Sequence, residues 1–540
     1  MEKKQTKIKG QSLASAAVLM VVATLGSRIA GLVRVMVLAR FGTEGEINAY
    51  YQAFSIPDVV YFLIAGGALR TGFVPVFTEY LATDRVQQAW KTFSSLLWLL
   101  LIFGGGIVAL GVIFAPTLAR WISPGWVGTE PELLQLCARI MQIIFPAQIC
   151  FVLGGLLMGS LNAQKHFLWP AMGPIVYNLF IISGALLALT MPQTFGLETI
   201  AYAVLLGALC GNVLLQVPPL IARDARLQRI IDFRDRGVQR VVKLALPVVF
   251  GLAVAEINYL VIRAFATNIE QGPAIMEFAN RLWKLPAGVV GAGIAIALFP
   301  TLAEHYAKDD EKQYLRDFSF GMRNTMFLTV PAAIVLGVMS GPIVRLLMEY
   351  GAFDTHSTQL VGQVMYWFAP GIVALSALYI VARAFYARHD TTTPLIVGTV
   401  SVAVCVGASF LLLEPMGLLG LAAAMTLSTL VNTGLLMSIL RARVGQIDGS
   451  SLLASALRSL PGNLFLGAVC FFGPQFIGDR WAGTGFMMRL TTVFVPLVVG
   501  AAGFIGLAAL FRVRELSSAW RLIVRRFARK KRTPEPTSPS

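Results

Sequence analysis

Residues 91–115 read KTFSSLLWLLLIFGGGIVALGVIFA, a run whose single charge, Lys91, is at its first position. A membrane-spanning helix needs about 20 consecutive apolar residues, and this run supplies them. Hydrophobic residues make up 56% of the 540-residue chain and charged residues only 13%. A soluble protein of this length needs far more polar surface. The ten-residue alternation of membrane β-barrels is absent from the sequence, so we predict an all-α polytopic membrane protein.

Similar apolar runs recur along the whole chain, and we expect about 14 transmembrane helices. The first run is too long for a signal peptide and should remain as a helix. The approximate limits of the runs are 12–41, 47–77, 91–115, 133–160, 169–190, 199–222, 241–266, 275–303, 319–345, 358–386, 393–413, 418–440, 452–476 and 487–511.

The chain has a net charge of +16, and its charged residues are distributed unevenly between the two sides of the predicted topology. If the N-terminus is cytoplasmic, most Lys and Arg fall in cytoplasmic segments, above all in 223–243 and 512–532. The opposite loops are rich in acids, such as Glu130, Glu198 and Glu270. This is the positive-inside pattern. It predicts that both termini lie in the cytoplasm, and it makes nucleic acid an unexpected partner.

Several classes of chemistry are excluded. The sequence contains no Walker A motif, no metal-ligand cluster and no soluble segment long enough for a catalytic domain. The cysteines all fall in apolar runs without a CxxC pair, as expected of small core residues. They are Cys137, Cys150, Cys210, Cys405 and Cys470. We therefore expect a transporter and not an enzyme, with no cofactor or metal, driven by the membrane potential or a cation gradient.

The chain repeats at an offset of about 224 residues. Phe41-Gly42-Thr43 matches Phe265-Ala266-Thr267, and residues 75–80 resemble residues 300–306. The unit contains six runs, an even number, so both copies enter the membrane from the same side, as in one class of transporters. This predicts two pseudo-symmetric six-helix lobes plus two extra C-terminal helices. The expected parts are an N-lobe (1–222), a basic cytoplasmic linker (223–240), a C-lobe (241–440), the two added helices (441–512), and a basic, then disordered tail (513–540).

Cations inside the apolar runs are the main functional signal. A charge at bilayer depth costs about 3 kcal/mol or more, so such residues usually have a role. Arg28 and Arg34 share the first run and lie about 120° apart on a straight helix. They are candidates for gripping phosphate, to which a planar guanidinium donates two hydrogen bonds. The alternative is that backbone carbonyls or a buried acid satisfy them.

Two later runs carry further candidates. Glu256 and Arg263 are seven residues apart and share a helix face. A salt bridge, either with Glu256 or with an acid on another span, is the simpler interpretation of Arg263, whereas Glu256 is a candidate ion-coupling site. Arg281 and Lys284 share a face just before Pro286 and a glycine series that loosens the helix. The alternative for this pair is snorkelling to the outer interface, above all for Lys284.

One more embedded cation, Arg70, follows the glycines at 66 and 67. Lys284, Arg70 and Arg263 are thus additional candidates for substrate cations, beside the main set of Arg28, Arg34 and Arg281.

With these residues in view, the sequence resembles the lipid II flippases of the MurJ (MviN) family, within the MOP exporter superfamily. The resemblance covers nearly the whole chain. It rests on Ser27 to Arg34, Ile56-Pro57-Asp58, Ala65 to Ala68, Phe73-Val74-Pro75, Ala279 to Leu282, Gly351 to Asp354 and Ala384 to Arg388.

The resemblance implies a transporter for peptidoglycan biosynthesis, cell wall biogenesis and cell shape, in the inner membrane of a bacterium. It implies alternating access that moves the undecaprenyl-diphosphate-linked precursor, lipid II, from the inner to the outer leaflet. Arg28, Arg34 and Arg281 match cavity arginines that bind the diphosphate, and the last two helices form a groove for the lipid tail. Partners would be lipid II, membrane lipids, and peptidoglycan synthesis and division proteins.

Three positions depart from well-studied relatives. Tyr61 stands where they carry a further essential Arg, and Asn48 and Lys284 stand where they carry acids. Other hypotheses also remain: a flippase for another polyprenyl-diphosphate-linked glycan, a cation-coupled multidrug antiporter, and a membrane scaffold without transport. The antiporter should have acids in its cavity, and a scaffold would not need buried cations in both lobes.

Overall fold

The computed structural model describes residues 13–42, 45–64, 68–223, 225–445, 449–480 and 485–516. These residues form helices and connecting turns, with no β-strand among them, which confirms the predicted all-α class. The expected tail from residue 517 onward and the 65–67 part of the Ala65–Ala68 motif lie outside the described residues.

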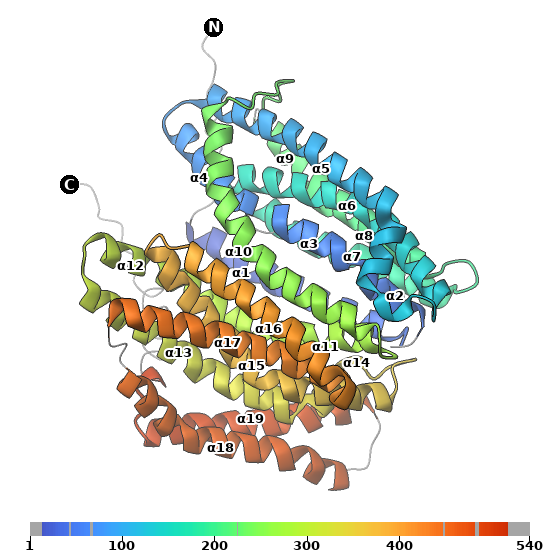
Figure 1. Cartoon of the computed structure of the whole chain (residues 1–540), viewed down its shortest axis with the longest axis vertical. Helices are drawn as coiled ribbons and strands as arrows, with labels where there is room; N and C mark the ends of the chain where they lie inside the picture. Colours follow the sequence, from blue (N-terminus) through green and yellow to red (C-terminus); the bar gives the residue numbers. More distant parts are fainter. Residues whose placement is uncertain are drawn as a thin grey trace, which may run out of the picture. The chain divides into compact units, whose positions relative to one another are not determined.

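The described residues in the first half of the chain, blue to green in Figure 1, form ten α-helices. They are α1 (Leu13–Ala39), α2 (Glu46–Ala53), α3 (Ser55–Ile64), α4 (Ala68–Ala82), α5 (Val86–Ile122), α6 (Pro131–Ala163), α7 (Leu168–Thr190), α8 (Leu197–Ala208), α9 (Val217–Ile221) and α10 (Arg236–Ala266). Short 3₁₀ turns are η1 (Pro124–Trp126) and η3 (Leu214–Gln216), and η2 (Leu209–Val213) is a π-helical turn.

In the second half, the residues that the structure describes form nine α-helices and the π-helical turn η4 (Ala287–Gly291). The helices are α11 (Gly272–Pro286), α12 (Ala292–Ala307), α13 (Glu311–Val338), α14 (Ser340–Met348), α15 (Thr355–Ala387), α16 (Thr392–Met416), α17 (Leu418–Val444), α18 (Gly449–Arg480) and α19 (Phe486–Leu510). In the described residues, 11 helices or helix series are long and apolar enough to cross a membrane. Each expected run coincides with a helix or a series of consecutive helices.

The sixth and eighth expected runs contain the short turns η2, η3 and η4. The second and ninth runs each break at a single residue, and proline explains both of these breaks. The second run breaks at Phe54, between α2 and α3, and the ninth breaks at Met339, between α13 and α14. Pro57 cannot donate to the Ala53 carbonyl, nor Pro342 to the Val338 carbonyl, so the helical ladder loses a bond there. Asp58 N donates to Phe54 O at 2.8 Å and restarts the ladder beyond the first break.

The predicted repeat is visible in the backbone. Asp84 after α4 and Asp309 after α12 have φ values of 55° and 54°. Lys165 after α6 and His389 after α15 likewise have φ values of 58° and 60°. At all four ends, the following residue donates to the carbonyl five positions back, as in a Schellman motif. Because the pairs are separated by the predicted offset, the two copies end corresponding helices in the same way.

The chain forms two compact units. The first contains Met1–Phe278, Met348–Ser357 and Cys405–Leu421, and the second contains Ala279–Leu347, Thr358–Val404 and Ala422–Ser540. In the first unit α1 packs on α7, α5 on α6, and α10 on α3 and α4; in the second α12 packs on α13, and α18 on α13 and α19. These units reflect packing in this conformation. The predicted lobes follow the repeat, so their boundaries stay predictions.

The expected linker lies along α5. Trp98 Nε1 donates to Gln228 O at 3.1 Å, and Gln228 N donates to Ser94 Oγ at 3.0 Å. Lys91 Nζ lies 2.8 Å from Asp232 Oδ2, and its hydrogen bond lowers the pKa of this half-buried carboxyl group. Asp235 Oδ1 accepts from Val238 N at 3.0 Å and so caps the start of α10. The segment between the lobes is therefore attached to the first unit by several polar contacts.

Candidate functional site

Helix α1 carries Arg28 and Arg34 on one uninterrupted helix. The Arg28 side chain is exposed, and Arg34 is half-buried. Helix α1 packs on α7, and Gly26 faces Ile175, because a Cβ there would lie 3.4 Å from Ile175 Cδ1, an ordinary contact distance. Arg28 shares an uncovered face of the helix with large apolar side chains such as Ile29. A mid-helix arginine on such a face needs water or an anion nearby, since lipid would leave its charge unsolvated.

Helix α11 carries Arg281, which is half-buried, and Lys284, which is exposed. Just beyond them, Pro286 cannot donate to the Leu282 carbonyl, and the helix widens into the π-helical turn η4. Such turns are frequent at functional sites. In the second unit, Gly291 allows this turn to approach α15, because a Cβ there would lie 2.8 Å from Ser376 Cα. The predicted loosening of this helix is confirmed.

Two other predicted residues are placed as follows. Arg70 lies in the first turn of α4, and its side chain lies outside the described part of the structure. Glu256 is half-buried in the middle of α10. Although Glu256 and Arg263 are on the same helix, the ion pairs of Arg263 go to other helices.

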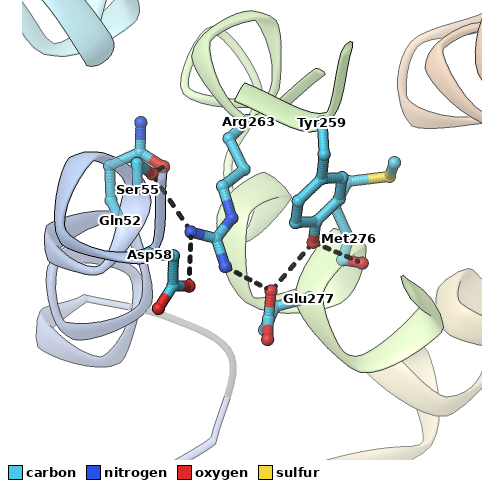
Figure 2. A network of polar contacts seen from close by, with 7 residues as sticks. All are labelled: Gln52, Ser55, Asp58, Tyr259, Arg263, Met276 and Glu277. Atoms are coloured by element: carbon cyan, nitrogen blue, oxygen red, sulfur yellow. Dashed lines mark hydrogen bonds and ion pairs between the residues drawn. The ribbon is translucent and has the colours of Figure 1, made fainter. Parts of the chain in front are cut away.

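Arg263 is the centre of a polar network in the first unit, drawn in Figure 2. Its side chain is only 6% exposed, and Nη2 donates to Glu277 Oε2 at 2.6 Å. Nη1 lies 3.5 Å from Asp58 Oδ2 and 3.4 Å from Ser55 Oγ. One guanidinium in α10 thus contacts both α11 and α3. The interspan salt bridge expected for Arg263 is present, with Glu277 and Asp58 as its acids.

Tyr259 completes the network from the preceding turn of α10. Its hydroxyl donates to Glu277 Oε2 at 2.8 Å, and its ring centroid lies 4.8 Å from the Arg263 guanidinium carbon. Glu277 is 7% exposed. Because the carboxylate receives two hydrogen bonds and the cation also meets a ring face, both buried charges are compensated.

Four more contacts in the first unit connect neighbouring helix ends and loops. Asn48 Oδ1 accepts from Ala274 N at 3.0 Å, and so caps the first turn of α11 from α2. Ala352 N donates to Arg40 O at 3.3 Å, and Gly125 N donates to Thr267 Oγ1 at 3.1 Å. The Phe278 ring meets Tyr51 edge-on, with 5.3 Å between centroids.

We call this set of contacts the latch: the Arg263–Glu277–Asp58–Ser55 network together with the pairs Asn48–Ala274, Arg40–Ala352, Gly125–Thr267 and Tyr51–Phe278. Apart from the Arg263–Glu277 pair, which lies within the expected C-lobe, each contact joins a residue of the expected N-lobe to one of the expected C-lobe. The helix ends involved are those that the predicted topology places on the outer side of the membrane.

Two positions that depart from the family pattern, Tyr61 and Asn48, make defined contacts in the structure. Tyr61 packs edge-on against Phe62 and Phe151, with centroids 5.2 and 5.1 Å away, and Phe151 meets Tyr177 at 5.3 Å. A half-buried aromatic row thus surrounds Tyr61, at the position where the resemblance implies an arginine. Asn48 serves as a helix cap, a role that an acid would also fill.

Glu277, Asp58 and Ser55 were missed as functional residues by the sequence analysis. The available signal was an acid within each of the runs 47–77 and 275–303, which should have a partner at membrane depth. Among the described residues, no group of three His, Cys, Asp or Glu side chains could hold a metal ion.

Comparison with known proteins agrees with this architecture. Residues 37–492 match the family model described as "Lipid II flippase MurJ". A "Probable lipid II flippase MurJ" from Rhizobium tropici is 30% identical over 528 residues, covering 96% of both chains. The "Lipid II flippase MurJ" of Burkholderia cenocepacia is 28% identical over 435 residues, covering 78% of this chain and 82% of its own.

Solved structures share the fold. A lipid II flippase MurJ in an inward closed conformation superposes with a TM-score of 0.73 at 21% identity, covering 92% of this chain and 98% of the other. An inward-facing MATE-family multidrug resistance transporter of the MOP superfamily gives a TM-score of 0.66 at 16% identity, covering 81% and 98%. The family model and the Rhizobium relative span most of this sequence, and the chain belongs to the lipid II flippase MurJ family.

Proposed function

We propose that this chain carries lipid II from the inner to the outer leaflet of a bacterial inner membrane, as a transporter and not as an enzyme. The match of the lipid II flippase model over residues 37–492 carries the proposal. Many membrane-spanning helices and cations on α1 and α11 support it, because a lipid-linked diphosphate needs both a membrane path and buried positive charge.

Arg28, Arg34 and Arg281 are the proposed diphosphate ligands. The uncovered face of α1 leaves Arg28 accessible to a substrate, and Arg34 is two turns nearer the end of the helix. Lys284, one turn after Arg281, and Arg70 are proposed as further cations. Arg263 would reach a substrate only if its 2.6 Å contact with Glu277 opened, so we assign it to the latch in this conformation.

In the proposed alternating-access cycle, the latch is the barrier that blocks passage of the substrate on one side of the membrane. On the proposed topology it closes the outer side, and substrate enters from the cytoplasmic side. Outward opening must separate Arg263 from Asp58 and Ser55, and Asn48 from Ala274. Binding of the diphosphate must compensate for these lost contacts, since a ligand shifts an equilibrium only by its difference in affinity for the two states. Movement of the lobes then weakens binding by separating the cations of α1 and α11.

Two driving forces fit the residues. Moving one charge through 100 mV changes its free energy by about 2.3 kcal/mol, so an inside-negative potential favours export of an anionic headgroup. Glu256, half-buried in α10, is the proposed site for a coupling cation. The lipid tail would run along the groove at α18 and α19, and peptidoglycan synthesis and division proteins are the proposed partners.

The test is a lipid II externalisation assay in cells depleted of their own flippase. We expect the parent chain to restore externally accessible lipid II, and Arg28→Ala and Arg281→Ala to abolish it at matched expression. Arg120→Ala is the control, because Arg120 is an exposed cation in the last turn of α5. A well-expressed parent that externalises a different polyprenyl-diphosphate glycan, and not lipid II, would refute the proposed substrate.

A further inference from the structure

The expected linker carries large apolar side chains on its surface. Residues 225–235 read ARLQRIIDFRD and precede the start of α10 without forming a helix; we call them the strap. Leu227 is 59% exposed, Ile231 48% and Phe233 56%. Several exposed large apolar residues in one short segment indicate an interaction surface, and the neighbouring contacts identify what covers it.

The polar groups of the strap face the protein. The Gln228 backbone is bonded through both of its groups, since O accepts from Trp98 Nε1 at 3.1 Å and N donates to Ser94 Oγ at 3.0 Å. Asp232 Oδ2 accepts from Lys91 Nζ at 2.8 Å. The strap is therefore attached to α5 by its backbone and by an acid, and its large apolar side chains are left uncovered.

The apolar side of the strap reaches membrane depth beside α5. The Phe233 ring meets the Phe103 ring edge-on, with 6.2 Å between centroids. Phe103 lies about 18 Å beyond Lys91 along the helix, at about 1.5 Å per residue. No charged residue occurs from 92 to 119, and a span of about 20 residues centred in this run places Phe103 inside the hydrocarbon layer. The Phe233 ring therefore enters the same layer.

The surface of α5 around this contact is apolar. Phe103 is 60% exposed, and Leu110 and Ile113, further along the helix, are also exposed. A membrane-spanning helix exposes such side chains to lipid, which is as apolar as they are. Because Phe233 lies against this surface, lipid is the medium that surrounds it.

The irregular backbone limits how deeply the strap can enter. Hydrocarbon cannot satisfy free backbone N–H and C=O groups, so a segment without regular helix stays out of it. The backbone must then lie at the level of the headgroups, where tryptophans such as Trp98 are typical. Arg226, Arg229 and Arg234 are exposed and alternate with the apolar residues. Long arginine side chains can extend to the headgroups and to water.

We propose that the strap is an interfacial membrane anchor: Leu227, Ile231 and Phe233 insert into the bilayer beside α5, and the backbone stays at the headgroups. On the proposed topology this is the cytoplasmic leaflet. Interfacial segments bury their apolar side about 5–10 Å into this boundary. Because apolar side chains determine the placement, it does not depend on the net charge of the segment. The connection between the predicted lobes is thereby attached to lipid as well as to α5.

The experiment measures the depth of each strap side chain by spin-label EPR. The full chain without its five native cysteines is labelled at single introduced cysteines and reconstituted into vesicles of phosphatidylcholine and phosphatidylglycerol. Oxygen concentrates in hydrocarbon and a nickel chelate in water, so the ratio of their collision rates with the label reports its depth. We expect oxygen collisions to dominate at Leu227→Cys, Ile231→Cys and Phe233→Cys.

The arginines of the strap are the matched controls, because they share its backbone and differ only in direction. The nickel chelate should dominate at R226C, R229C and R234C, so the logarithm of the ratio should change sign between neighbouring positions. Phe103→Cys is the reference for hydrocarbon. Gln193→Cys, in the exposed turn between α7 and α8, is the reference for water. Thermal unfolding of each labelled chain checks that it folds like the parent.

Two results would overturn the proposal. Chelate-dominated collisions at every strap position would show that the apolar side chains are in water. Low collision rates with both reagents at the apolar positions would show that protein, and not lipid, covers them. Neither result depends on whether lipid II is the substrate, so failure of the anchor is distinct from failure of the proposed transport.

Discussion

The Arg263 guanidinium donates to Glu277 at 2.6 Å and lies 3.5 Å from Asp58. Its two acids are unequal: Glu277 is nearly inaccessible, whereas the Asp58 side chain is 38% exposed. The Glu277 contact therefore holds α10 to α11 within the expected C-lobe, and the weaker Asp58 contact joins that lobe to α3. Opening the latch can break the second contact without exposing an unpaired Arg263.

This inequality predicts different effects of removing each acid. Removing one partner of a buried ion pair costs about 3–5 kcal/mol, because the other charge stays buried. Glu277→Ala should therefore lower the free energy of unfolding by this amount. Asp58→Asn should cost about 1 kcal/mol, since it removes a longer and partly solvated contact. The measurement is thermal unfolding in detergent, followed by tryptophan fluorescence.

Glu198→Ala is the control for Glu277→Ala. Glu198 pairs with Arg139 at 3.3 Å, but both side chains are exposed, so its loss should cost about 0–1 kcal/mol. If Glu277→Ala and Glu198→Ala unfold at the same temperature, the Arg263 network does not stabilise the closed helix ends.

A disulfide across the latch should stop transport. A Cβ at Gly42 would lie 3.2 Å from Ala352 Cβ, which is slightly shorter than the Cβ separation of about 3.5–4.5 Å in a disulfide, so a small outward shift brings the pair into bonding geometry. In a chain without its five native cysteines, Gly42→Cys with Ala352→Cys should cross-link on oxidation and lose lipid II externalisation. Reduction should restore it, because outward opening must separate these residues. Export by a fully cross-linked protein would show that the latch stays closed during transport.

The two single-cysteine variants are the controls for this cross-link. Gly42 has φ 86°, and a side chain in such a conformation costs about 1–2 kcal/mol. Gly42→Cys alone should thus be somewhat less stable than the parent but insensitive to oxidant. Ala352→Cys alone should also transport in both redox conditions.

Asn48 should act through helix capping. Asn48→Leu leaves the Ala274 amide without its acceptor and should lower the free energy of unfolding by about 1 kcal/mol. Asn48→Asp retains an acceptor and adds negative charge at the start of α11, which the helix dipole favours, so its stability should stay near that of the parent. Amide hydrogen exchange of the first turn of α11 measures this directly. Equal protection in all three proteins would exclude the capping role.

The positions of the helices were predictable from the sequence because lipid imposes a length and a polarity on each span. The division of two spans was missed, although Pro57 and Pro342 carried the signal, because hydropathy averages over single residues. The repeat was predictable from short matches, and the turns at Asp84 and Asp309 confirm it.

The latch was not predictable from one sequence. Helical spacing relates residues on one helix, and so it pointed from Arg263 to Glu256. The actual partners are 14 and 205 residues away, on other helices, and only tertiary packing brings them together. The arginines of α1 and α11 were identified by the cost of charge in lipid, which marks a functional residue without saying what it touches. Their joint action on a diphosphate stays a prediction.

The loop after α6 should respond to pH. Burial, together with the nearby Arg223, lowers the pKa of His166 below its ordinary value of 6.5, and Arg223 Nη2 lies 3.0 Å from His166 Nδ1. The neutral ring accepts from Arg223, whereas a protonated ring would place two cations together. Because the unfolded state binds more protons between the folded pKa and 6.5, stability rises with pH through this window and is lost as pH falls below 6.5. The protection of amides 164–167 against hydrogen exchange, measured relative to the intrinsic rate at each pH, should therefore fall from pH 7.5 to pH 5.5. His166→Gln, which accepts a hydrogen bond without titrating, should remove this loss of protection. Its persistence in the glutamine variant would assign the pH response to another group.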